Sequence, residues 1–109
     1  GNPADASLLA SQSATVTNTP DSGLFDTVNI SSTPHVSGSF FVAVVMSHSA
    51  GIYPAAIDTT SSQSSSWVSY TSTQGTYNIA NPAANEYLNL IDNAAPKYAG
   101  NWMLRAHGI

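Results

Sequence analysis

The sequence predicts a mostly β protein, an antiparallel β-sandwich of the jelly-roll kind with about seven strands. Three observations lead to this fold. Apolar residues alternate with polar ones in several short segments, at intervals of about ten residues. Turn residues separate these segments, and only residues 82–92 read as a short helix or ordered loop. A closed barrel is the alternative architecture, and 109 residues allow one domain spanning 1–109.

The first half of the chain contains three predicted strands. Residues 8–17 are rich in small and β-branched residues and stop at a dense turn signal over 19–23. Residues 24–30 alternate in the manner of a half-buried strand. Residues 36–47 are apolar on both faces, which predicts a central strand covered on two sides and an anchor for the core. We expect Phe40 in this strand to be buried.

The second half supplies the remaining elements. Residues 52–58 contain Pro54 and predict an edge strand, whereas 59–66 form a hydroxyl-rich loop expected to be exposed and mobile. Residues 67–70 and 76–79 read as a hairpin around a Gly-containing turn. Asn81 and Pro82 are typical of a helix start, and 101–108 predict the last strand with a buried Trp102.

Composition excludes several function classes. Two basic residues against six acidic ones give a net charge of −4, so the chain lacks a basic surface for nucleic acid. The longest apolar run is far too short to span a bilayer, so membrane insertion is not expected. The absence of cysteine rules out disulfides and thiolate chemistry. Ser and Thr make up roughly a quarter of the chain, which suits a secreted, extracellular β protein.

The order of motifs resembles the accessory β-sandwich domains found beside catalytic domains in secreted bacterial proteins such as extracellular peptidases. The likeness rests on Val36-Ser37-Gly38-Ser39-Phe40-Phe41-Val42-Ala43-Val44, on Ser72-Thr73-Gln74-Gly75-Thr76-Tyr77, and on the terminal Leu104-Arg105-Ala106. It implies a non-catalytic accessory or binding module attached to a secreted hydrolase. The chain starts at a point internal to that pattern, which predicts missing upstream strands supplied by a cleaved partner chain or a neighbouring copy.

Catalysis is not expected from these residues. Ser47, His48 and Asp58 are the nearest approach to a Ser-His-Asp set, but no strained nucleophile turn accompanies them, and neighbours on a strand point to opposite faces. Arg105 is expected to pair with Asp26, Asp58 or Glu86 while its stem covers the sheet.

Two kinds of binding site remain open. Calcium is the candidate metal, with Asp21, Asp26 and Asp58 at or near predicted turns, although the same residues commonly bond their own backbone. Aromatic side chains that stack on sugar rings are the candidate glycan or surface-polymer site. The candidates are Tyr53, Trp67, Tyr70, Tyr77, Tyr87 and Tyr98, and the set chosen is Trp67, Tyr70, Tyr77 and Tyr53, with Trp67 following the hydroxyl-rich loop.

The sequence therefore supports two functions. The first is the accessory module, whose partner is an adjacent catalytic domain. The alternative is a structural subunit of an extracellular filament or surface assembly that uses strand exchange. Low charge, abundant hydroxyls and an incomplete sheet favour the alternative.

Overall fold

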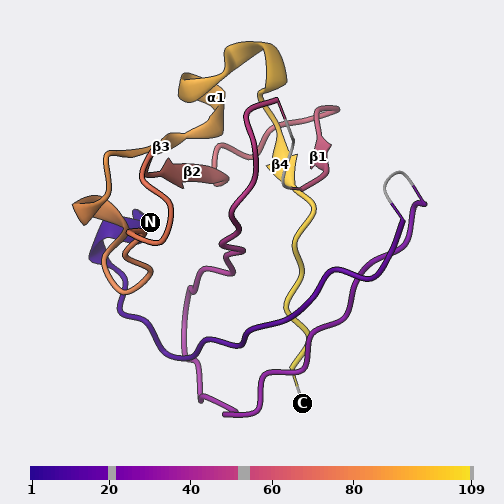
Figure 1. Cartoon of the computed structure of the whole chain (residues 1–109), viewed down its shortest axis with the longest axis vertical. Coiled ribbons are helices and arrows are strands. Elements are labelled where there is room, and N and C mark those ends of the chain that lie inside the picture. The colour runs from indigo at the N-terminus through magenta and orange to yellow at the C-terminus, as the bar shows by residue number, and fades with distance from the viewer. Residues whose placement is uncertain (20–21, 52–54, 109) are drawn as a thin grey trace.

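The computed structural model describes residues 1–19, 22–51 and 55–108. Its regular elements are short, and every strand lies in the second half of the chain (Figure 1). In chain order they are η1 (Pro3–Asp5), β1 (Ile57–Asp58), β2 (Trp67–Tyr70), η2 (Pro82–Ala84), β3 (Tyr87–Leu90), α1 (Ile91–Ala94), η3 (Pro96–Tyr98) and β4 (Asn101–Trp102), where η marks a 3₁₀ helix.

The strands form two separate antiparallel pairs. β1 pairs with β4, so that Ile57 lies opposite Trp102. β2 pairs with β3 over four residues, and at one end Tyr70 lies opposite Tyr87. The two tyrosine rings stack with centroids 5.0 Å apart, a cross-strand aromatic contact that supports the register.

Residues Ser66 and Trp67 join the two sheets. The Trp102 indole donates a hydrogen bond from Nε1 to the Trp67 carbonyl at 2.9 Å. The Trp102 backbone N–H donates to Ser66 Oγ at 3.0 Å, and the Ile91 N–H donates to the Ser66 carbonyl at 2.9 Å. These three bonds connect the beginning of β2 to both β4 and the start of α1.

The hydrophobic core is small and sits at this junction. Ile91, at 7% exposure, is the one buried hydrophobic residue among 1–19, 22–51 and 55–108. Around it lies an apolar hollow of about 350 Å³. Its lining residues are Ala55, Ile57, Ile91, Ala95, Tyr98 and Trp102.

The first half of the chain has a different character. Residues 7–19 and 22–51 run as long irregular segments that extend away from the two sheets (Figure 1). In the described part of this stretch, the single backbone-to-backbone hydrogen bond is a turn in which the Ser22 N–H donates to the Thr19 carbonyl at 3.2 Å. The large apolar side chains of this half are exposed.

The predicted seven-strand sandwich is therefore wrong. Within the described residues, 8–17, 24–30 and 36–47 contain no strand, and Phe40, expected in the core, is 50% exposed. Alternating apolar residues favour an extended chain, but a strand exists only when a second backbone pairs with it. Among residues 1–19, 22–51 and 55–108, no segment supplies that second backbone.

In the second half of the chain, several observed elements differ from the predicted ones. β2 was predicted correctly over 67–70, but its partner is β3 rather than 76–79, where Asn78 instead exchanges hydrogen bonds with the side chain of Asn85. The predicted helix over 82–92 divides into η2, β3 and the start of α1. Of the predicted last strand, β4 keeps two residues, and Trp102 is half-buried. The predicted edge strand keeps β1, while 52–54 lie outside the described residues.

The hydroxyl-rich loop over 59–66 is not free. Asp92 accepts hydrogen bonds from Ser62 Oγ at 2.6 Å and Ser64 Oγ at 3.1 Å. Asn101 accepts from the Gln63 N–H at 2.9 Å, and its amide donates back to the loop. The loop is therefore tied to α1 and β4, although most of its side chains remain exposed.

Gly100 offers a test of the β1–β4 pair. A Cβ at this position would overlap the backbone carbonyl of Asp58, which cannot move without separating the two strands. We expect Gly100→Ala to destabilise the protein by about 1–3 kcal/mol, measured by chemical denaturation. Gly108→Ala is the matched control, because nothing lies near its Cβ. Equal stability of both variants would contradict this account of the pair.

Candidate functional site

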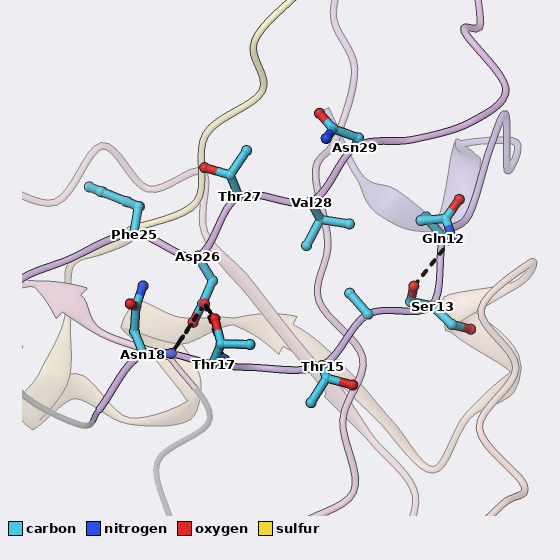
Figure 2. Close-up of a pocket in the computed structure, with 11 residues that line it drawn as sticks. Gln12, Ser13, Thr15, Thr17, Asn18, Phe25, Asp26, Thr27, Val28 and Asn29 are labelled. Carbon is cyan, nitrogen blue, oxygen red and sulfur yellow. Dashed lines mark hydrogen bonds between the residues drawn. The ribbon is translucent and has the colours of Figure 1, made fainter.

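A hollow in the first half of the chain lies between two irregular segments, residues 12–18 and 25–29. Its volume is about 430 Å³. Figure 2 shows the two segments facing each other across an opening, and we call this hollow the groove. The groove is lined by Gln12, Ser13, Ala14, Thr15, Thr17, Asn18, Phe25, Asp26, Thr27, Val28 and Asn29.

Asp26 closes the end of the groove nearest the turn. Its carboxylate accepts hydrogen bonds from the Thr17 N–H at 3.1 Å, from Thr17 Oγ1 at 2.8 Å and from the Asn18 N–H at 3.2 Å (Figure 2). The Thr17 hydroxyl, followed by the Thr17 backbone N–H, lowers the pKa of Asp26 below its ordinary value of 3.8. The carboxylate is therefore ionised at neutral pH and bridges the two segments.

Gln12 closes the opposite end. Its Oε1 accepts hydrogen bonds from Ser31 Oγ at 3.0 Å and from the Ser31 N–H at 3.4 Å. The two bridges keep one antiparallel register, because five residues forward from Gln12 to Thr17 correspond to five residues back from Ser31 to Asp26. The segments are thus aligned as a hairpin would be.

The backbones of the two segments do not bond to each other. Across the described residues of 12–18 and 25–31, the contacts between them are side-chain bridges rather than ladder hydrogen bonds. Neighbouring strands in a sheet lie about 4.7–4.9 Å apart and exchange backbone bonds. The groove therefore lies between two aligned segments that are bridged by side chains at both ends and make no backbone-to-backbone hydrogen bonds with each other in the described structure.

The C-terminal segment contacts one wall. The Arg105 guanidinium lies over the Phe25 ring, 4.7 Å from its centroid, in a cation–π contact. The prediction that Arg105 pairs with Asp26, Asp58 or Glu86 is wrong, because each of these carboxylates is occupied by hydroxyl and amide donors. Phe25 is thereby oriented beside the groove.

The predicted calcium ligands do not assemble. Asp58 accepts from the Thr60 hydroxyl and N–H at 2.7 and 2.9 Å, Asp26 closes the groove, and Asp21 lies outside the described residues. The hydrogen bond from the Thr60 hydroxyl is the main cause that lowers the pKa of Asp58, and the bond from the Thr60 backbone N–H is the second. Among the residues that the structure describes, no group of three His, Cys, Asp or Glu side chains is placed to hold a metal ion.

The residues of the predicted aromatic site differ in their exposure. Tyr70 is 52% exposed on β2, whereas Trp67 and Tyr77 are half-buried. The Trp67 indole Nε1 is buried without a hydrogen-bond partner. Tyr53 lies outside the described residues. Tyr87 is also among the aromatic candidates, but the sequence did not predict that its ring stacks on Tyr70 to make a two-ring surface.

The three residues Ser47, His48 and Asp58 do not form a hydrogen-bonded set in the described structure. His48 Nδ1 lies 3.0 Å from the Ser49 carbonyl, while Asp58 is occupied by Thr60. The geometry therefore shows no hydrogen bond from the histidine to the acid or to Ser47 among the described residues.

Comparison with protein-family models, with curated proteins and with solved structures found no match. Over the part of the chain that the structure describes, no helix has the length and apolarity needed to cross a membrane.

The hydrogen bonds that the Asp26 carboxylate accepts should depend on pH. Because the folded pKa is lowered, the bridge is complete at neutral pH and is lost as pH falls through the folded value. We expect the Thr17 and Asn18 amide resonances to shift on acidification from about pH 5 to about pH 2, followed by NMR. Asp26→Asn should remove this titration, and Asp5→Asn should leave it. An unchanged titration in Asp26→Asn would show that another group holds these amides.

Proposed function

We propose that this chain is a non-catalytic structural subunit of an extracellular assembly in which copies complete one another by strand exchange. The observation that carries the proposal comes from residues 7–19 and 22–51, which expose apolar side chains along backbones that have no strand partner in the described structure. Apolar surface and unpaired backbone groups together are what β-augmentation uses for recognition.

The exposed area supports this proposal. The chain has an accessible surface of 8516 Å², whereas a self-contained monomer of 11.3 kDa has roughly 5,700 Å². The excess is concentrated in the stretch before β1. Large apolar side chains exposed there include Leu24, Phe25, Val28, Ile30, Phe40, Phe41, Val42, Val44 and Val45. A surface of this kind is typical of proteins that bury it against a partner.

Composition supports the extracellular setting. The chain has no cysteine, few charges and an unusually high content of Ser and Thr. Four of its six acidic side chains, Asp26, Asp58, Glu86 and Asp92, accept hydrogen bonds from hydroxyl groups rather than from lysine or arginine. Such a chain needs neither a reducing compartment nor a counter-ion network.

Replacing one exposed apolar residue by a charged residue tests the proposal. Val44 is 52% exposed, so Val44→Lys leaves the isolated chain intact but places a charge where a partner strand would pack. We expect it to raise the concentration needed for assembly by about tenfold, measured by analytical ultracentrifugation and electron microscopy.

Met103→Lys is the matched control, since Met103 is exposed to a similar degree but lies after β4. It should assemble as the wild type does. Wild-type protein that remains monomeric at high concentration would overturn the proposal.

One observation favours a second function, the accessory module with a glycan or surface-polymer site. The stacked rings of Tyr70 and Tyr87 form an exposed aromatic surface on the β2–β3 pair, and such surfaces bind the apolar face of sugars.

On a glycan array, Tyr70→Ala should then lose binding and Tyr70→Phe should keep it, because the ring rather than the hydroxyl makes the contact. Binding that survives Tyr70→Ala, or no binding by the wild type, would exclude this surface as a glycan site.

A further inference from the structure

We propose that the groove between residues 12–18 and 25–29 accepts residues 40–46 of a second copy as an inserted strand. The inference rests on the proposed function and makes it specific, because it names the segment that is donated and the place that receives it.

The walls of the groove fit an extended segment. Residues 12–18 and 25–31 are aligned antiparallel, yet their backbones make no hydrogen bonds with each other in the described structure. A strand between them can bond to both walls, antiparallel to one and parallel to the other. Such a strand also takes over the N–H groups of Thr17, Asn18 and Ser31, which Asp26 and Gln12 now occupy.

The segment 40–46 has the composition of a donated strand. It reads Phe-Phe-Val-Ala-Val-Val-Met, with no charge, proline or glycine, and its large side chains are exposed. Seven residues match the seven residues of the wall at 12–18, each spanning about 23 Å when extended. The donor also brings no second carboxylate next to Asp26.

The fold presents this segment away from its own groove. None of residues 40–46 lines the groove. The flanks are held on both sides, because Ser31 is bonded to Gln12 and the Ala56 carbonyl accepts from the Met103 N–H at 3.0 Å. Gly38 and Gly51 have positive φ values of 77° and 83°, so the chain turns on either side of the segment. One copy thus offers the segment, while its own groove is closed only by the Asp26 and Gln12 bridges, which the inserted strand must break.

The absence of cysteine makes a direct test available. Thr15 lies at the middle of one wall and Ala43 at the middle of the donor. Thr15→Cys and Ala43→Cys proteins, prepared separately and mixed under mild oxidation, should form a disulfide-linked heterodimer. We expect its yield to exceed by about tenfold that of Thr15→Cys mixed with Ser72→Cys, because docking raises the local thiol concentration. Val42→Cys and Val44→Cys cover a shift of register by one residue.

Four other outcomes overturn the inference. If the protein assembles and a disulfide joins Ala43→Cys of one copy to Ala43→Cys of another, identical segments stack on each other. This result contradicts the groove as acceptor but leaves the proposed function standing. Assembly with no crosslink at 42, 43 or 44 has the same meaning. A disulfide within one chain, formed by the dilute Thr15→Cys/Ala43→Cys double variant, shows that the segment fills its own groove. Monomers with no crosslink at any concentration overturn both the inference and the proposed function.

Discussion

Three hydrogen bonds to Ser66 and Trp67 are the contacts on which the ordered half of this protein depends. They connect β2 with β4 and with the start of α1, although the strands involved have two or four residues. An isolated two-stranded sheet is marginally stable in water. Because the Trp102 indole reaches the Trp67 carbonyl, the two sheets and the core around Ile91 form one cooperative unit rather than two weak hairpins.

Hydroxyl groups take the role that basic side chains have in other proteins. With two basic residues in the chain, the carboxylates are held instead by Ser and Thr. The same arrangement recurs four times, with Thr17 on Asp26, Thr60 on Asp58, Ser72 on Glu86 and Ser62 on Asp92. In each case the hydroxyl bond is the main cause of a lowered pKa. The high Ser and Thr content is thus a structural feature as well as a surface property.

Local features were predictable from the sequence, and pairing was not. The turn after residue 17, the strand over 67–70 and the helical start at Pro82 follow from neighbouring residues, and the structure contains all three. The partner of β2 depends on Asn78, which bonds to Asn85 instead of extending a strand. The groove escaped prediction because its bridges at Gln12 and Asp26 involve side chains, which leave no apolar pattern. The stacking of Tyr87 on Tyr70 was not predicted because the segment that contains Tyr87 was predicted to be a helix or an ordered loop.

The unpaired segments differ in their protection against nonspecific pairing. Edge strands in soluble proteins commonly carry a charge or a proline that discourages association. Residues 24–34 contain Asp26 and Pro34, whereas residues 40–46 contain neither. A chain under pressure only to remain monomeric gains nothing from leaving its most apolar segment without such a residue, since β-prone segments of this length associate readily. The unprotected segment is therefore best explained by a specific partner strand, and its neutral character sets it apart from the charged wall at Asp26.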